Sequence, residues 1–169
     1  PIEKEVVTKL ISYCDKENIP VRYSTYDLNC LVKDYGAAVF DKFFKLYLNY
    51  PIVKEYEQEE VFNMLVYPKT SSQVETLKIL MKECSIIEHS ASVLEFTAKG
   101  CDKSKGVSYM CSRWNISTKE IVCVGDGAND VEMLKEAGLG IAMGNGNEKA
   151  KKAADRICGH IDDDGLYKI

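Results

Sequence analysis

The stretch "IVCVGDGANDVEML" at residues 121–134 constrains the fold of this chain more than any other. A short apolar run ends at Gly125, two acids and an amide follow, and the apolar residues then take a helical spacing. A buried strand that leads directly into a helix is typical of a βα unit in a parallel sheet. Ligands of such sheets bind beyond the carboxyl ends of the strands, which is where Asp126 would lie.

Asp126 and Asp130 bring two carboxylates to the end of this strand. Like charges repel, and carboxylates near a buried strand end are costly unless a positive group joins them. Gly127 leaves room for a ligand near the backbone, and the helix that starts at Asn129 and Asp130 favours anions at its amino end. Mg²⁺ usually accepts one or two protein carboxylates, several waters and a phosphate oxygen. We therefore predict a Mg²⁺ site that serves a phosphate group, with an ordinary Asp turn or helix cap as the alternative.

Lys105 supplies a positive charge upstream, in the segment "DKSKGVSYM" at residues 102–110. It lies in the first turn of a predicted helix that leads into the strand. A lysine beside a bound phosphoryl group offsets the charge on the transferring oxygens. Lys103 is the alternative residue for this role, and a solvated lysine is the alternative interpretation of both.

The rhythm of the chain changes near residue 97, which predicts two domains, 1–97 and 98–169. The first reads as an α+β unit with helices on one face of a small sheet. Its predicted strands are 21–26, 61–67 and 92–98, and its predicted helices end before Pro20, span 71–84, and include Phe40, Phe43, Phe44 and Tyr47. The second alternates a helix through Val107 and Trp114 with strands at 121–124, 139–143 and 155–158 and helices at 130–137 and 146–153. The predicted fold class is therefore α/β, a parallel Rossmann-like portion joined to an α+β domain.

Composition narrows the classes of function. The net charge of −4 argues against a dedicated nucleic-acid binder. No apolar run approaches the roughly 20 residues that a membrane-spanning helix needs, and no signal-peptide pattern opens the chain. The 7 cysteines form no C-x-x-C pair, which fits reduced thiols in a cytoplasmic protein. His89 and His160 lie far apart in the sequence, and neither is assigned a role.

Two sequence motifs together indicate a protein family more specifically than either motif does alone. "KSKGVSYM" is followed about 20 residues later by "IVCVGDGANDVEMLKEAGLGIAMGNGNEKAKKAADRI". This resembles the haloacid dehalogenase-like phosphatases, and the Cof-type branch in particular. Their pattern reads s-K-G, G-D-x-x-N-D-x-x-M-L, a-G-x-g-v-A-M-x-N-A, A-D and a closing D-G-V. Here Gly146 replaces the usual Ala, and "DDDGL" at 162–166 stands for the last piece.

The resemblance implies a Mg²⁺-dependent phosphomonoester hydrolase that works through an aspartyl-phosphate, acting on sugar phosphates or similar small metabolites. It implies that 1–97 is a substrate-specificity cap and 98–169 the C-terminal part of the core. By position, Asp126 would ligate Mg²⁺, Lys105 would hold the phosphoryl group and the nucleophile, Asn129 would contact substrate or phosphate, and Asp130 would orient the site.

The nucleophile of that family lies in a D-x-D-G-T motif that precedes the cap, and residues 1–169 contain no such motif. The nearest imitation pairs Asp162 with Asp164, for which a solvated acidic turn is the favoured interpretation. We therefore expect that the chain is the C-terminal two-thirds of a phosphatase, without turnover by itself.

Two alternatives stay open on the sequence: a non-catalytic Mg²⁺- or phosphate-binding module, and a receiver-like signalling domain. Arg22, Tyr23 and Tyr26 are scattered polar candidates for substrate contact in the first domain. The pattern specifies neither one phosphorylated substrate nor an oligomeric state.

Overall fold

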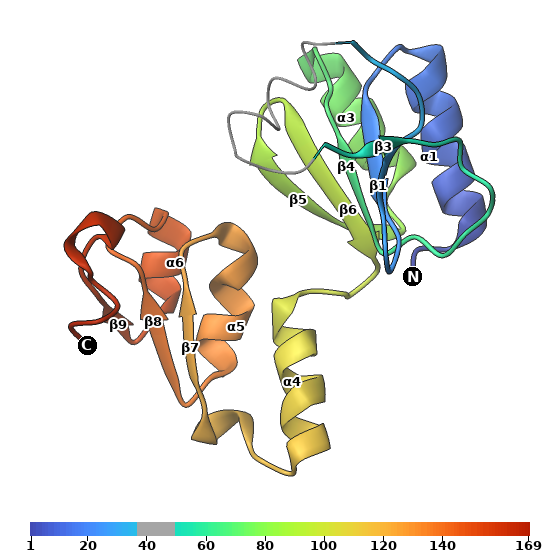
Figure 1. Ribbon diagram of the computed structural model, residues 1–169. Helices are drawn as coiled ribbons and strands as arrows, with labels where there is room; N and C mark the ends of the chain where they lie inside the picture. Colours follow the sequence, from blue (N-terminus) through green and yellow to red (C-terminus); the bar gives the residue numbers. More distant parts are fainter. Residues whose placement is uncertain (37–49) are drawn as a thin grey trace. The chain divides into compact units, whose positions relative to one another are not determined.

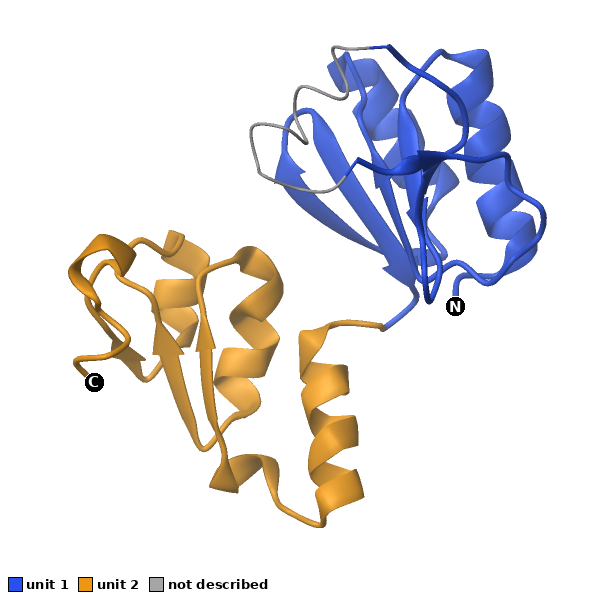
Figure 2. Cartoon of the chain, viewed as in Figure 1, with its two compact units in different colours: residues 1–100 blue, residues 101–169 orange. Residues whose placement is uncertain are grey.

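The computed structural model describes residues 1–36 and 50–169, so the helix expected on Phe40, Phe43, Phe44 and Tyr47 lies outside the described residues. The chain divides into two compact units, Pro1–Gly100 and Cys101–Ile169 (Figure 2). Each unit contains its own sheet and its own cluster of buried apolar side chains.

Unit 1 is built on a mixed sheet in the order β3-β2-β1-β4-β6-β5 (Figure 1). Its pairings are antiparallel except for β2 with β3. The elements are α1 (Lys4–Lys16), β1 (Val21–Ser24), β2 (Asn29–Leu31), β3 (Ile52–Val53), β4 (Asn63–Val66), α3 (Ser71–Leu80), β5 (Cys84–Ser90) and β6 (Val93–Ala98).

The core of unit 1 lies between one face of this sheet and helices α1 and α3. Strands β1 and β4 alternate buried and half-buried residues, as a sheet covered on one face does. The apolar stripe of α1, which includes Val7, Leu10 and Cys14, meets the buried strand residues, among them Met64 and Phe96. Burial raises the pKa of the Cys14 thiol to about 12, so this cysteine is a packed apolar side chain.

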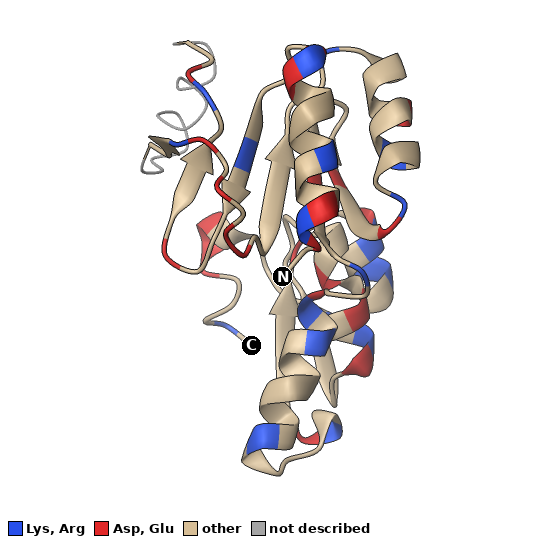
Figure 3. Cartoon of the chain, turned by 90° about the vertical axis from the view of Figure 1, so that its right-hand side faces the viewer, with Lys and Arg blue, Asp and Glu red and all other residues tan. Residues whose placement is uncertain are grey.

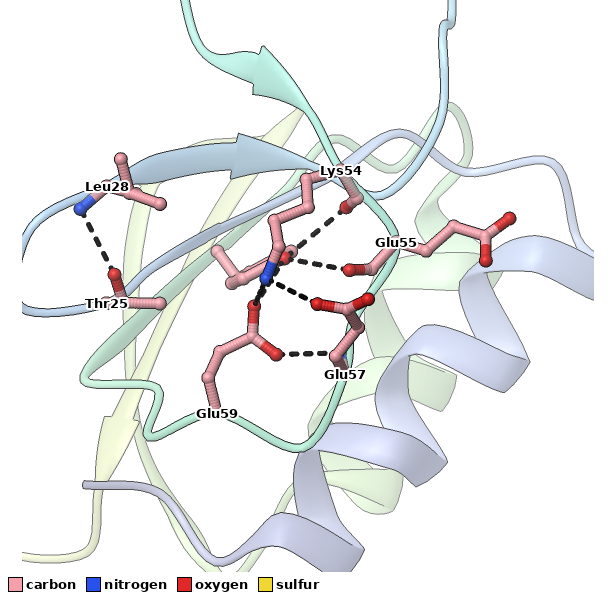
Figure 4. Close-up of polar contacts among 7 residues, drawn as sticks. Thr25, Leu28, Lys54, Glu55, Glu57 and Glu59 are labelled. Carbon is pink, nitrogen blue, oxygen red and sulfur yellow. Dashed lines mark hydrogen bonds and ion pairs between the residues drawn. The ribbon is translucent and has the colours of Figure 1, made fainter.

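A polar network holds the loop that leads from β3 to β4 (Figure 4). The Glu59 carboxylate accepts hydrogen bonds from Lys54 Nζ at 2.7 Å and from the hydroxyl of the buried Tyr23 at 3.0 Å. Its other oxygen accepts the backbone N–H of Glu57 at 2.7 Å. Burial alone would raise the pKa of Glu59, but these donors outweigh it and lower the pKa to about 2.

Unit 2 is a parallel sheet in the order β7-β8-β9, with helices that follow the strands (Figure 1). Its elements are α4 (Lys103–Trp114), β7 (Val122–Gly125), α5 (Val131–Glu136), β8 (Leu139–Ala142), α6 (Glu148–Ala153) and β9 (Arg156–Ile157). The parallel α/β pattern confirms the fold class expected from the sequence. The buried core combines Cys123 of β7 with Leu134 of α5 and Ala150 of α6, and α4 adds the partly buried Val107.

Part of the predicted apolar face of α4 is exposed. Cys111 is buried, but Trp114 is 64% exposed and Met110 36%. The two line an apolar hollow of about 560 Å³ together with Val122, itself 58% exposed. Strand β7 pairs with β8, and its other edge has no strand partner among the described residues.

Charged residues of both signs are interspersed along the helices (Figure 3). Among the residues that the structure describes, no helix combines the length and the apolar character that crossing a membrane requires.

Candidate active site

The site predicted from the sequence lies at the carboxyl end of β7. Strand β7 ends at Gly125, which is paired in register with Ala142 of the parallel strand β8. Asp126 and Met143 therefore follow the two strands at the same edge of the sheet. A 3-10 turn at Ala128–Asp130 then connects Asp126 to α5.

Asp130 is buried under this turn, with a side chain only 2% exposed. Its Oδ2 accepts the backbone N–H groups of Asp126 at 2.9 Å and Gly127 at 2.8 Å. Its Oδ1 lies 2.5 Å from Lys103 Nζ. Burial acts to raise the pKa of Asp130, but the hydrogen bonds from Lys103, Gly127 and Asp126 hold the pKa below its ordinary value. Asp130 is therefore an ionised residue that fixes the turn after β7.

Gly125 is required by this close packing, and Gly127 gives room to the Asn129 side chain. A Cβ on Gly125 would lie 2.5 Å from the Cβ of Asp130, and one on Gly127 would lie 2.3 Å from Oδ1 of Asn129. Real Cβ atoms do not approach other atoms so closely. The sequence G-D-G therefore lets Asp130 fold back beneath Asp126.

The structure brings Lys103, not Lys105, to the acidic turn. Both lie in the first turn of α4, which is capped by the Asp102 side chain accepting the Lys105 backbone N–H at 2.9 Å. The Lys103 side chain reaches Asp130. That of Lys105 is exposed and forms no hydrogen bond or ion pair with the residues that the structure describes. The geometry thus favours the residue that sequence reasoning held as the alternative.

Asp126 itself is exposed, and its carboxylate forms no hydrogen bond or ion pair within residues 1–36 and 50–169. It lines an open hollow of about 700 Å³, which we call the Asp126 hollow. The other lining residues are Met143, Asn145, Ile161 and 164–167. Asn129 is half-buried in the adjoining turn. Asp126, Asn129, Asp130 and Lys103 are thus brought together at one strand end.

The donor set fits one part of a Mg²⁺ site. The described residues contain no group of three or more His, Cys, Asp or Glu side chains arranged to hold a metal ion. Mg²⁺ does not need such a group, because it usually takes one or two protein carboxylates and completes its shell with water and phosphate oxygens. Asp126 offers an uncommitted carboxylate of this kind, whereas both oxygens of Asp130 already accept hydrogen bonds.

Other acids and both histidines lie elsewhere. Asp162 is in the 3-10 turn Ile161–Asp163, and Asp164 follows it with a positive φ of 52°. Both are exposed and neither follows a strand, as a solvated turn requires. His160 caps the same turn, and His89 of unit 1 contacts Glu95 on β6.

Sequence reasoning missed Asn145, which lines the Asp126 hollow. Its Oδ1 accepts the backbone N–H of Ile161 at 3.1 Å. The quoted motif contained this residue, but a contact between positions 145 and 161 depends on the fold, which no local pattern shows.

Comparison with known proteins agrees with this architecture. Over 169 residues, 98% of the chain and 65% of the relative, the chain is 24% identical to YkrA of Bacillus subtilis. Over 87 residues, 52% of the chain and 35% of the relative, it is 34% identical to 5-amino-6-(5-phospho-D-ribitylamino)uracil phosphatase YcsE of Bacillus subtilis.

A solved structure of a sugar phosphatase of haloacid dehalogenase subclass IIB superimposes with a TM-score of 0.85 at 28% identity. The superposition covers 99% of this chain and 65% of that one, so the chain spans less than two thirds of these relatives. The model of the haloacid dehalogenase-like hydrolase family matches residues 1–169. The chain belongs to the family of haloacid dehalogenase-like hydrolases.

Proposed function

We propose that this chain is the substrate-selecting and metal-holding part of a Mg²⁺-dependent phosphomonoester hydrolase. The observation that carries the proposal is the Asp126 carboxylate at the end of β7, which has no partner in the described part of the chain and lies beside the Lys103–Asp130 ion pair. In this proposal Asp126 ligates Mg²⁺ and Asn129 contacts the substrate or its phosphate. Asp130 orients the turn, and Lys103 takes the phosphate-facing role first considered for Lys105.

Residues 1–97 are proposed to be the cap and residues 98–169 the C-terminal part of the core. Support comes from the separate sheets and separate buried cores of the two units. The compact units meet at Gly100 and Cys101. The parallel sheet that carries Asp126 belongs to unit 2, so the proposal places the chemistry there and substrate selection in unit 1.

The carboxylate nucleophile is proposed to come from sequence outside these 169 residues. One edge of β7 has no strand partner among residues 1–36 and 50–169, and the apolar hollow beside it has Val122 58% and Trp114 64% exposed. This edge would accommodate one more strand of the parallel sheet. A strand paired there would end at the same edge of the sheet as Asp126. Burial of these apolar side chains would favour its binding.

The proposed chemistry divides hydrolysis into two steps. A carboxylate first takes the phosphoryl group from the ester oxygen of the substrate, and the alcohol leaves. Water then takes the phosphoryl group from the carboxylate, and phosphate is released. When bound, Mg²⁺ would neutralise charge that develops on the phosphoryl oxygens. The Lys103 ammonium, held by the ionised Asp130, would add a fixed positive charge at the same place. The peptide groups of Asp126 and Gly127 are fixed by Asp130 as well, which holds the backbone that carries the proposed metal ligand.

The substrate is proposed to be a small phosphorylated metabolite such as a sugar phosphate. Two relatives support this class, since one is named a sugar phosphatase and another a phosphatase of a phosphoribitylamino-uracil. We further propose that the protein acts in the cytoplasm.

The proposal is tested first by metal binding to the 169-residue chain. Mn²⁺ binding, followed by electron paramagnetic resonance as a Mg²⁺ substitute, should weaken at least about tenfold in Asp126→Asn, because the substitution removes the charged ligand. Asp164→Asn is the matched control, since Asp164 lines the same hollow but is proposed to hold no metal. Equal affinity in the two variants would contradict the role of Asp126.

Turnover is tested with p-nitrophenyl phosphate and Mg²⁺. The 169-residue chain should show no hydrolysis above background, and a form extended at its N-terminus by a strand with a D-x-D motif should be active. Asp126→Asn in the extended form should abolish most of that activity. Full activity of the short form would refute the external nucleophile, and an inactive extended form that binds Mn²⁺ would indicate a binding module.

A further inference from the structure

One loop joins the strand end at Asp126 to the C-terminal segment of unit 2. We call residues 143–147, between β8 and α6, the 143–147 loop. The N–H of Met143 donates to the carbonyl of Gly125 at 3.0 Å, and the N–H of Asn147 donates to the carbonyl of Asp126 at 2.9 Å. A Cβ on Gly146 would lie 3.1 Å from the Cα of Asp126. The loop is therefore packed directly against the backbone of Asp126.

The same loop is also packed against the segment that follows β9, through Gly159. The N–H of Gly144 donates to the carbonyl of Gly159 at 3.0 Å, and a Cβ on Gly144 would lie 2.7 Å from the carbonyl carbon of Gly159. Gly165 returns onto Gly159 so closely that a Cβ there would lie 2.1 Å from its carbonyl oxygen. Three glycines thus let the backbones of loop and segment approach each other.

Two side chains of the loop contact the segment that follows β9. Met143 Sδ accepts from Cys158 Sγ at 3.4 Å, and Asn145 reaches further along the chain, to the residues that line the hollow. Asn145 Oδ1 accepts the N–H of Ile161, the residue at which the final 3-10 turn begins. Residues 161–167, which we call the C-terminal wall, line the Asp126 hollow through Ile161 and residues 164–167. Asn145 therefore lies in a loop that contacts both the backbone of the proposed metal ligand and the C-terminal wall, and all three line the same hollow.

We propose that Asn145 is a positioning residue that holds the C-terminal wall beside whatever binds at Asp126. The proposal deepens the function proposed above and depends on it for the identity of the ligand at Asp126. The wall presents apolar and aromatic side chains, Ile161, Leu166 and Tyr167, to the hollow. Their distance from the bound ion would set the space left for the organic part of a phosphorylated substrate.

Asn147 provides a matched control within the same loop. Its Oδ1 also accepts a backbone N–H, that of Ala150 at 2.8 Å, but this bond caps α6 and does not reach the wall. Asn145→Leu removes the acceptor with little change in size, and Asn145→Asp keeps it. Together with Asn147→Ala, which removes only the helix cap, these variants separate loss of the Ile161 bond from general loss of stability.

The experiment uses the 169-residue chain with Mn²⁺ as the probe and the broadening of its backbone amide signals in NMR spectra. In the unsubstituted chain and in Asn145→Asp, signals of Gly127, the 143–147 loop and residues 161–167 should all broaden. In Asn145→Leu the broadening of 161–167 should fall while that of Gly127 and the loop persists. Asn147→Ala should keep the full pattern although its melting temperature falls. An unchanged pattern in Asn145→Leu would overturn the proposal.

Hydrogen exchange of the Ile161 amide tests the role of Asn145 without any metal ion. Asn145→Leu should speed this exchange about fivefold, the factor to which one ordinary hydrogen bond corresponds, and Asn145→Asp and Asn147→Ala should not. If Mn²⁺ broadens no signal near Asp126 but exchange at Ile161 responds as expected, the metal site fails and the role of Asn145 stands. Equal exchange in all four chains would overturn that role.

Discussion

At the scale of single residues, Asp130 and Asp126 differ in what their oxygens already bind. Both oxygens of Asp130 accept hydrogen bonds inside the protein, and its side chain is buried. Asp126 lines a hollow, and its carboxylate has no partner among the described residues. One acid therefore shapes the turn, and the other is available for a ligand.

The Lys103–Asp130 pair should contribute to stability. Lys103→Met would leave a buried carboxylate with its backbone donors but without its cation. Because the lysine is 51% exposed and water screens part of the interaction, we expect a loss of only about 1 kcal/mol in the free energy of unfolding. Lys105→Met is the control and should stay within about 0.5 kcal/mol. Urea unfolding at pH 7 measures both, and equal losses would contradict the assignment of Lys103.

Two glycines should respond to alanine with opposite signs. Gly125→Ala places a Cβ 2.5 Å from the Cβ of Asp130, so the turn must shift, at a cost of about 1–3 kcal/mol. Gly106 lies within α4, where a Cβ would meet nothing within 4 Å. Gly106→Ala should therefore stabilise the chain by about 0.5–1 kcal/mol. Thermal unfolding checks the pair, and a neutral Gly125→Ala would contradict the close packing.

The residues of the turn after β7 could be predicted from the sequence, because a strand, a glycine and two acids are local features. The choice between Lys103 and Lys105 could not. Both lie in the first turn of one helix, and only the angle at which α4 meets the turn decides which ammonium reaches Asp130. Asn145 was missed for a similar reason, since its partner is Ile161.

At the scale of elements, the predicted ends of helices and strands were wrong where pairing between strands overrides the local sequence pattern. The helix predicted over 71–84 ends at Leu80, because Cys84 begins β5 and pairs with Ala98 of β6. Strand β5 was not predicted, since "CSIIEHS" has no clean alternation of apolar and polar residues. The very short strands β2 and β3 were also not predicted, whereas the ends of β7 and β8 were predicted to within about one residue.

The loop that leads from β3 to β4 should make stability depend on pH. Glu59 has a folded pKa of about 2, below the ordinary value of a glutamate. Its contribution is complete above the unfolded pKa and is lost as pH falls from about 5 through 2, because the unfolded chain then binds the proton more tightly. Glu59→Gln should flatten the fall of the unfolding free energy across this window. Urea unfolding between pH 6 and 2.5 measures it, with the exposed neighbour Glu60→Gln as control.

At the scale of the whole molecule, the chain contains two cores of different size. The described core of unit 1 joins α1, α3 and the strands of a six-stranded sheet, whereas that of unit 2 rests on a few small side chains around Leu134. Burial of apolar surface dominates stability, so unit 2 should open more easily. The exposed Trp114, and the edge of β7 that lacks a strand partner among the described residues, also favour easier opening of unit 2.

Hydrogen exchange should show this difference directly. Amides of β7 and β8 should exchange at least about tenfold faster, relative to their intrinsic rates, than amides of β4 and β6. Leu134→Ala should cost about 2–5 kcal/mol and accelerate exchange in unit 2 alone, and Leu94→Ala should do so in unit 1 alone. Acceleration across both units in either variant would contradict separate cores.

Cys101, the first residue of unit 2, is exposed, whereas five of the other cysteines are buried and Cys158 is half-buried. A thiol-reactive dye should therefore attach at the junction of the units in the unaltered chain, faster than at any other cysteine. Cys101 is therefore a natural site for a fluorophore or spin label at the junction of the units. A label there would report any change at the junction when ligand is added.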